Sequence, residues 1–210
     1  MAFAKNKNVA IRGIAACVPS HVEDNLTLSV FKEGEAERVI AQTGIERKHT
    51  VVPGSNVTIS DLCAKAFDTL IAELGWERES IDALVLVSST ADYITPPTSN
   101  VLHGKLGLSE ECICFDIRQG CPGWVVGMNV LSSMVSLGNV KRAILLFGDS
   151  STLMNSPYDK ETRPLFGDAG SATALEFDVT APDIVFHHGS KGRDFEAIIT
   201  PVGGLRNPIT

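Results

Sequence analysis

Two uninterrupted apolar runs, each of strand length, most strongly constrain how this chain can fold. They span residues 83–88 (Ala-Leu-Val-Leu-Val-Ser) and 143–147 (Ala-Ile-Leu-Leu-Phe). A strand without polar alternation has both faces covered, which is the usual state of strands in parallel sheets flanked by helices. We therefore expect a layered α/β fold rather than a helix bundle or a two-sheet sandwich.

Helical and strand-like segments alternate around these two runs. Helices are predicted over residues 26–43, 58–74, 99–106 and 122–137. Three of them stop before a glycine that suits a helix C-terminus, namely Gly44, Gly75 and Gly138. Further strands are predicted over residues 9–18, 112–117, 171–177 and 184–188, the last two as a final pair. Residues 203–210 have the composition of a loop, and no linker or short repeat divides residues 1–210, which we treat as one unit.

Charge and composition argue against several classes of protein. A net charge of -7 and a pI of about 5.2 disfavour nucleic acid or an anionic membrane surface as the main partner, because either would favour a basic face. A hydrophobic content of 44% is too high for a disordered tail. Residues 1–10 lack the apolar segment of a signal peptide, and no apolar run reaches the ~20 residues of a membrane-spanning helix. We expect a cytoplasmic globular protein.

The cysteines are expected to be reduced thiols, because their number is odd and they are scattered through apolar surroundings. Cys112 and Cys114 would share one face of a strand and could form half of a metal site. No second Cys or His pair stands at zinc-like spacing, so structural thiols are the favoured interpretation and no metal site is predicted. The cysteines are Cys17, Cys63, Cys112, Cys114 and Cys121.

The segment from Asp116 to Trp124 is the most informative in the chain. It places Cys121 between a buried strand and an apolar helix, with Pro122 suited to the first helical position and Cys121 therefore at the N-cap. The partial positive charge of a helix start favours a thiolate, the nucleophilic form of cysteine. Gly120 and Gly123 leave room for a substrate or another backbone. The alternative is that Cys121 is one more buried cysteine beside glycines that only pack a helix on a sheet, and local chemistry leaves both interpretations open.

Two other motifs are better explained by structure than by chemistry. Residues 166–172 (Phe-Gly-Asp-Ala-Gly-Ser-Ala) lack the spacing of a phosphate-binding loop and lead into a strand, so a tight turn with Asp168 capping backbone N–H groups is predicted. His187 and His188 are adjacent on a predicted strand, so their rings point to opposite faces and are not placed to share a metal ion.

The order of the motifs resembles β-ketoacyl-acyl carrier protein synthase III, a family of the thiolase-like superfamily. The resemblance extends from about Val9 to the end of the chain. It rests on residues 43–47 (Thr-Gly-Ile-Glu-Arg), 84–88 (Leu-Val-Leu-Val-Ser), 96–99 (Pro-Pro-Thr-Ser), 116–121 (Asp-Ile-Arg-Gln-Gly-Cys) and 166–170 (Phe-Gly-Asp-Ala-Gly).

This resemblance implies a five-layered α/β/α/β/α enzyme of two related halves that works as a homodimer in fatty acid biosynthesis. The family transfers an acyl group from acyl-coenzyme A to a cysteine, and malonyl-acyl carrier protein then condenses with the thioester and loses carbon dioxide. Cys121 matches the nucleophile, and its own N–H would contribute to the oxyanion hole. Coenzyme A thioester enters as a substrate, and no bound cofactor is implied. The helix after Cys121 is apolar on more than one side, which suits the central layer.

The chain also departs from the family pattern. The family's catalytic His and Asn belong to the second half and have no counterpart here, so residues 1–210 are expected to be the N-terminal half, as a cloned fragment or a split polypeptide. Arg38 stands where relatives carry a Trp that stacks on the adenine of coenzyme A, and Gln42 replaces a nearby Arg, so those coenzyme A contacts are not reproduced. Thr95 stands where a bulky aromatic often limits the acyl pocket, which implies a roomier pocket.

Two alternatives to a condensing enzyme remain at this stage. A thiolase-fold acyltransferase could use Cys121 to pass the acyl group to a small-molecule or sugar acceptor. A non-catalytic subunit could instead dimerise with an active synthase and shape its pocket. The presence of Cys121 argues against the second alternative, and the lack of the His and Asn argues for it.

Overall fold

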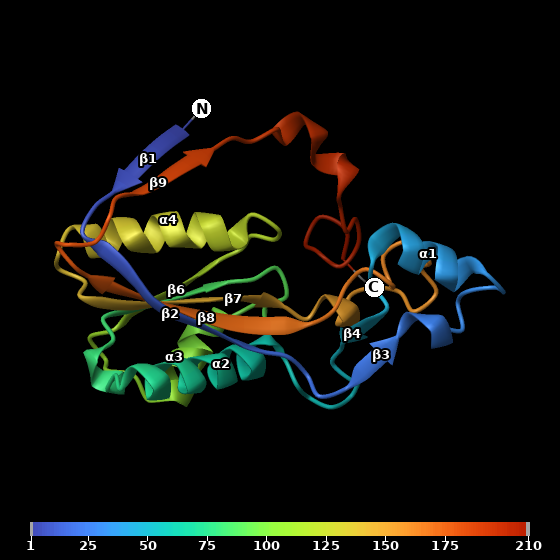
Figure 1. The fold of residues 1–210 in the computed structure, drawn as a ribbon, viewed down its shortest axis with the longest axis horizontal. Coiled ribbons are helices and arrows are strands. Elements are labelled where there is room, and N and C mark those ends of the chain that lie inside the picture. Colours follow the sequence, from blue (N-terminus) through green and yellow to red (C-terminus); the bar gives the residue numbers. More distant parts are fainter. Residues whose placement is uncertain (1, 209–210) are drawn as a thin grey trace.

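A computed structural model describes residues 2–208 and has a five-stranded mixed sheet at its centre (Figure 1). Three neighbouring strands run parallel, and two further strands extend the sheet in antiparallel pairing. The two apolar runs are adjacent central strands, as predicted, with Val87 opposite Phe147. The strands in sheet order are β2 (Val9–Cys17), β8 (Ala169–Phe177), β7 (Arg142–Asp149), β5 (Ala83–Val87) and β6 (Ile113–Ile117).

Helices cover both faces of this sheet, which confirms the predicted α/β layering (Figure 1). α2 (Ile59–Leu74) and α3 (Thr98–Leu106) lie on one face, and α4 (Gly123–Ser136) lies on the other. The buried side chains form two clusters, one on each side of the sheet. Alternate residues of β5 enter different clusters, Leu84 and Leu86 on the α2 side and Val85 and Val87 on the α4 side, as the pleat of a strand requires.

The helix boundaries follow local chemistry where caps are present. α2 begins at a capping box in which Thr58 N donates to Asp61 Oδ2 at 3.0 Å, and it ends at Gly75, whose φ is 63°. The helix predicted over 26–43 starts later than expected, because α1 spans only Glu35–Thr43. Gly34 precedes it with a φ of 75°, a conformation that interrupts a right-handed helix, so residues 28–34 form turns instead.

Both strands of the predicted final pair are present as β8 and β9 (Ile184–His188), but they do not pair with each other, because they belong to different sheets. β9 pairs with β1 (Ala2–Asn6), a strand that sequence patterning did not identify, and the two form a ribbon that lies across α4 (Figure 1). Asn6 holds the ribbon to α4, donating to Ser132 Oγ at 2.7 Å and to Asn129 Oδ1 at 3.2 Å. Pairing of the first and last strands joins segments far apart in sequence, which a local pattern does not encode.

The remaining elements are short. β3 and β4 form a second two-stranded sheet beside α1, and Glu23 of β3 forms ion pairs with Lys48 and Arg163. Within the predicted loop, residues 203–208 form turns with one bridge, and residues 209–210 lie outside the described part. The short elements are β3 (Val22–Asp24), β4 (Arg47–His49) and the 3-10 turns Asn25–Thr27, Arg78–Ser80, Ser151–Leu153 and Gly192–Ala197.

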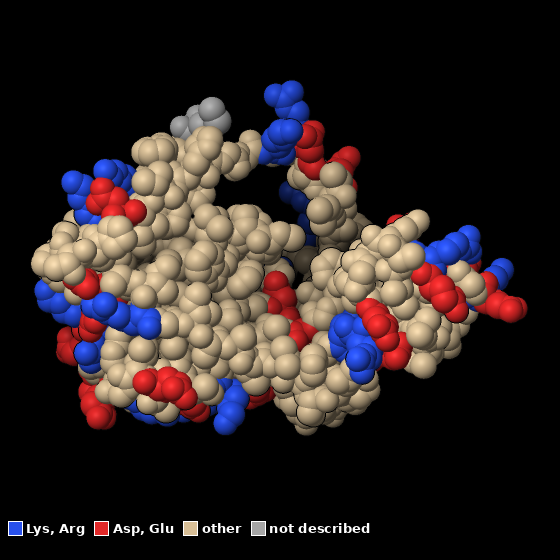
Figure 2. Space-filling model, in the orientation of Figure 1, with Lys and Arg blue, Asp and Glu red and all other residues tan. Residues whose placement is uncertain are grey.

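Two properties of residues 2–208 bear on partners. None of their helices combines the length and apolar character that a bilayer crossing requires. Figure 2 shows lysines and arginines interspersed with acidic side chains over the visible face rather than gathered into one basic patch.

Two glycines one helical turn apart allow α4 to press against the sheet. A Cβ atom added to Gly123 would lie 2.7 Å from a methyl of Val87 and 2.9 Å from the ring of Phe147. A Cβ added to Gly127 would lie 2.7 Å from methyls of both Val87 and Leu145. Distances below 3 Å are steric clashes, so only glycine permits this approach. The start of α4 is thereby fixed over the ends of β5 and β7.

Substitution of Gly127 by Ala is expected to destabilise the protein by about 1–3 kcal/mol, because overpacking outweighs the gain in helix propensity. Gly104→Ala is the matched control. Gly104 lies within α3 with no heavy atom within 4 Å of its added Cβ, so this change should stabilise by about 0.5–1 kcal/mol. Urea unfolding midpoints measure both variants. Equal shifts in the two midpoints would show that α4 does not depend on the close approach.

Candidate functional site

The carboxyl ends of the parallel strands β5, β6 and β7 meet at one edge of the sheet. The turn Ser88–Thr90 follows β5, the segment Arg118–Cys121 follows β6, and Asp149 ends β7. Cys121 is exposed there, immediately before α4. The interpretation of Cys121 as one more buried cysteine is therefore wrong.

Cys121 lies one residue further from α4 than predicted. Pro122, and not Cys121, is the N-cap, with φ of −82° and ψ of 5°. A turn closes first, in which Gly123 N donates to Gly120 O at 2.7 Å, and the helical pattern then begins with Val126 N donating to Pro122 O at 3.1 Å. Gly120 has open space around it, as expected, whereas Gly123 packs against the sheet and leaves no room for a substrate.

The start of α4 carries no side-chain cap. Proline has no polar side-chain atom, so it cannot accept from the N–H groups of the first turn. Those groups and the helix dipole retain their attraction for negative charge. The indole of Trp124 donates to Thr173 Oγ1 at 3.1 Å and ties this first turn to β8. The arrangement offers an exposed thiol beside fixed N–H donors, which suits nucleophilic attack on a thioester.

Three other thiols lie in surroundings that disfavour the thiolate. Burial raises the pKa of Cys63 to about 12 and that of Cys112 to about 11. Burial also raises the pKa of Cys114, with Asp116 adding to the effect. Cys112 and Cys114 pack on the same side of the sheet, as predicted.

Four of the five histidines make hydrogen bonds away from Cys121. His21 contacts Thr50 and His49 contacts the carbonyl of Pro19. His103 contacts the carbonyl of Ser109, and His188 contacts Asn129 on α4. The remaining one, His187, is exposed on β9. Because it is adjacent to His188 in this strand, the two rings lie on opposite faces, as predicted. These four imidazole rings are therefore engaged elsewhere, and the start of α4 sets the local environment of Cys121.

A cavity of about 530 Å³ opens at the same edge of the sheet. Arg118, three residues before Cys121, forms part of its wall, and Ile94 and Pro97 lie in the wall on either side of Thr95. Thr95 itself is exposed and joins Pro96 through a cis peptide bond. Neither Thr95 nor Cys121 lines this cavity itself, although residues close to each of them in sequence do.

The other two predicted residues, Arg38 and Gln42, line a separate hollow of about 250 Å³ on α1. Lys160 reaches this hollow from a distant segment and pairs with Glu35 of α1. Arg38 Nε donates to the carbonyl of Gly34 at 3.1 Å. The sequence analysis missed Lys160, and nothing in the pattern around it indicates that it lies beside α1.

Asp168 has the predicted role of a cap. Its Oδ2 accepts from Val51 N at 2.6 Å, and its Oδ1 accepts from Thr152 N at 2.9 Å. The buried carboxylate joins the segment after β4 to the segment after β7.

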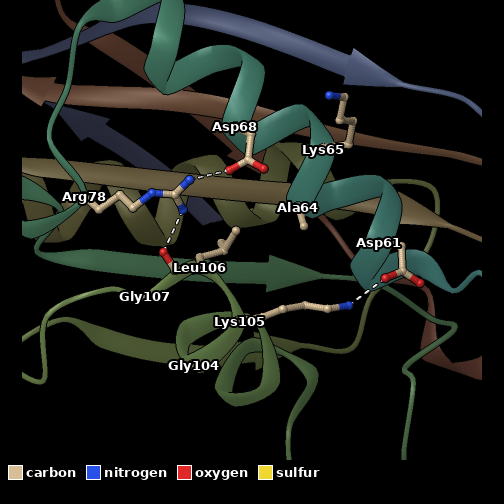
Figure 3. A pocket seen from close by; sticks show the side chains of 9 residues that line it. All are labelled: Asp61, Ala64, Lys65, Asp68, Arg78, Gly104, Lys105, Leu106 and Gly107. Atoms are coloured by element: carbon tan, nitrogen blue, oxygen red, sulfur yellow. Dashed lines mark hydrogen bonds and ion pairs between the residues drawn. The ribbon is translucent and has the colours of Figure 1, made fainter.

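A further hollow of about 490 Å³ lies between α2 and α3, on the sheet face opposite α4 (Figure 3). Two ion pairs fix its walls, Arg78 with Asp68 at 2.8 Å and Lys105 with Asp61 at 2.6 Å. Arg78 also donates to the carbonyl of Leu106 at 2.7 Å. These charges satisfy one another and join the two helices, so we interpret this hollow as structural.

Comparison with known proteins relates the chain to one enzyme family. A family model described as 3-oxoacyl-[acyl-carrier-protein (ACP)] synthase III matches residues 115–192. The β-ketoacyl-[acyl-carrier-protein] synthase III 2 of Streptomyces coelicolor is 32% identical over 92% of this chain and 58% of its own length. The β-ketoacyl-[acyl-carrier-protein] synthase III of Acholeplasma laidlawii is 30% identical over 90% of this chain and 61% of its own length.

The crystal structure of a 3-oxoacyl-(acyl-carrier protein) synthase from Burkholderia xenovorans superposes with a TM-score of 0.94 and 34% identity. It covers 97% of this chain, and this chain covers 58% of that protein. The thiolase-like fold is therefore confirmed for the part described. The chain spans little more than half the length of these relatives.

Limited iodoacetamide labelling of the folded chain is expected to modify Cys121 first. Its thiol is exposed at a helix start, whereas burial holds Cys63 and Cys112 protonated. Peptide mapping should show Cys121 labelled at least about tenfold faster than either. The chain unfolded in guanidinium is the control, in which all five cysteines should label at similar rates. Preferential labelling of Cys63 or Cys114 in the folded chain would contradict this account.

Proposed function

Because this chain is related to 3-oxoacyl-[acyl-carrier-protein] synthase III along at least nine-tenths of its length, we propose that it carries the acyl-accepting thiol of such a condensing enzyme. The single observation that supports this function most strongly is the exposed Cys121 at the uncapped start of α4. The whole enzyme takes an acyl group from a thioester and condenses it with malonyl-acyl carrier protein, releasing carbon dioxide.

The first half-reaction follows from the surroundings of Cys121. The thiolate sulfur attacks the carbonyl carbon of an acyl thioester, and the carbonyl oxygen becomes negatively charged in a tetrahedral intermediate. Backbone N–H groups at the start of α4, including that of Cys121, are the proposed donors to this oxygen. Collapse breaks the bond to the departing thiol, which takes up a proton, and leaves the acyl group on Cys121.

The hollow on α1 is the proposed contact for the phosphorylated end of the acyl donor. Arg38 supplies positive charge there and Gln42 supplies an amide, while the charge of Lys160 is paired with Glu35 in the same hollow. Acyl-coenzyme A is the proposed donor and acyl carrier protein brings the malonyl group. Thr95 is smaller than an aromatic side chain, and we propose that it leaves space for a longer acyl chain beside the cavity that its neighbours Ile94 and Pro97 line.

The complete enzyme is proposed to be a cytoplasmic homodimer. Val125 on the outer side of α4 is 43% exposed, and burial of such apolar surface favours association. Sedimentation of the purified protein tests this part of the proposal, and a compact monomer that binds no hydrophobic dye would contradict it.

Incubation with acetyl-coenzyme A or acetyl-acyl carrier protein is expected to add one acetyl group per chain. The adduct should map to Cys121 by peptide mass spectrometry and should be absent from Cys121→Ser. Cys114→Ser is the matched control, because Cys114 is half-buried on the other side of the sheet and should not affect acetylation. Absence of acetylation in the unaltered protein would favour a non-catalytic subunit, and acetylation of another cysteine would refute the assignment.

Residues 1–210 alone are expected to catalyse no decarboxylative condensation. Loss of carbon dioxide from the malonyl group generates an enolate, and a thiol by itself does not stabilise that charge. Four of the five histidines already have other partners. Carbon dioxide release and ketoacyl product are measured with malonyl-acyl carrier protein after acetylation of Cys121. Steady formation of the ketoacyl product by this chain would overturn the prediction, whereas thioester exchange at Cys121 would not.

A further inference from the structure

One carboxylate oxygen at the end of β7 gathers the turn that follows β5. Asp149 Oδ1 accepts from Ser89 N at 2.7 Å and from Thr90 N at 3.1 Å. It also lies within hydrogen-bond distance of three hydroxyls, those of Ser88 and Ser89 at 2.9 Å and that of Thr90 at 3.1 Å. Hydrogen bonds to a charged acceptor are stronger than those to a neutral one. Asp149 therefore holds the turn Ser88–Thr90 against the neighbouring strand.

The same turn is tied to both parallel neighbours of β5. Ser88 N donates to the carbonyl of Ile117 on β6 at 3.2 Å. On the β7 side, Ser150 N donates to Thr90 Oγ1 at 2.9 Å. The chain thus leaves the sheet from a base that is held on two sides.

A second carboxylate fixes the point where the chain returns. Asp116 Oδ2 accepts from Thr98 N at 2.7 Å, and its Oδ1 accepts from Ser99 N at 2.8 Å, so it caps the start of α3. Thr98 Oγ1 in turn accepts from Asp92 N at 3.0 Å. Residues 91–97 therefore span between two carboxylate anchors, Asp149 on one side and Asp116 on the other.

The middle of this loop projects from its anchors. Ile94 is 98% exposed and Tyr93 is 60% exposed, so apolar packing does not hold the tip in place. Tyr93, Ile94 and Pro97 nevertheless line the cavity of about 530 Å³ whose wall also includes Arg118. The position of this part of the wall, and of Thr95 between Ile94 and Pro97 in the same loop, therefore depends on the hydrogen bonds at the base of the loop.

We propose that Asp149 is a positioning residue that sets which acyl chains reach Cys121, by fixing the base of the loop that carries Thr95. This inference rests on the proposed function of Cys121 as the acyl acceptor. Asp149 acts through the loop and does not itself contact the reacting atoms. Loss of Asp149 removes the acceptor that the N–H groups and hydroxyls of this turn share, and the loop then samples more positions.

The chain supplies graded variants and a matched control. The contacts of Asp149 with residues 88–90 all fall on Oδ1. Asp149→Ala removes this acceptor, whereas Asp149→Asn can keep a neutral oxygen at the same place. Asp82 performs the same kind of bridging at the opposite end of the same two strands, where its Oδ2 accepts from Lys141 N at 2.6 Å and Arg142 N at 3.0 Å. Asp82→Ala therefore reports a general loss of sheet stability without touching the loop.

Two measurements on the purified protein test the proposal. Amide hydrogen exchange follows residues 88–97, and the ratio of Cys121 acylation rates with acetyl- and octanoyl-coenzyme A gives the chain-length selectivity. Asp149→Ala should speed exchange in residues 88–97 by about tenfold or more. It should change the selectivity ratio by about threefold or more, with Asp149→Asn between it and the unaltered protein. Asp82→Ala should lower the unfolding midpoint and leave both quantities unchanged.

The outcomes separate this proposal from the proposed function. Equal changes in Asp149→Ala and Asp82→Ala would overturn the positioning role, and so would faster exchange without a change in selectivity. If Asp149→Ala fails to fold, Asp149→Asn tests the positioning role through the same measurements, hydrogen exchange in residues 88–97 and the chain-length selectivity ratio. No acylation of Cys121 in the unaltered protein would overturn the proposed function and the selectivity role together, while exchange in residues 88–97 would still show whether Asp149 anchors the loop.

Discussion

The close approach of α4 to the sheet is the contact on which the rest of the arrangement depends. Gly123 and Gly127 let the helix backbone press against Val87, Leu145 and Phe147, which belong to the two adjacent central strands β5 and β7. A side chain at either glycine would move the helix outward by clash. With the helix held there, its uncapped N-terminus stands at the edge where β5, β6 and β7 end, and Cys121 comes directly before it. The packing of the core thus determines where a thiolate would be stabilised.

Carboxylates organise the same edge of the sheet without occupying the position of the thiol. Asp116 caps α3, Asp149 holds the turn after β5, and Asp168 joins the segments beyond β4 and β7. Each one accepts backbone N–H groups of residues that lie outside the sheet ladders. The edge is consequently built of short, fixed connections, while the cavity wall at Tyr93 and Ile94 projects freely into solvent. Such a division between fixed base and projecting rim is what a site needs if it is to hold its nucleophile and still admit substrates of different length.

The sequence predicted those parts of the fold that local chemistry determines. The apolar runs at 83–88 and 143–147 became adjacent strands, and the glycines at 44 and 75 ended helices at the expected residues. The start of α1 was placed too early, because Gly34 interrupts a segment of otherwise good helix formers. The pairing of β1 with β9 and the position of Lys160 beside Glu35 depend on contacts across more than a hundred residues, which no local pattern carries. Cys121 was identified from its motif but placed one residue too far into the helix, because Pro122 can occupy the N-cap as well as the first helical position.

The central claim is that the thiol of Cys121 accepts an acyl group with the start of α4 as its oxyanion site. A crystal structure of the protein after reaction with an acyl donor tests that claim most directly. The account predicts continuous electron density from Cys121 Sγ into an acyl group, with the thioester oxygen within hydrogen-bond distance of backbone N–H groups at residues 121–125. Density for the acyl group on another cysteine, or a thioester oxygen at Cys121 directed away from those N–H groups, would contradict it.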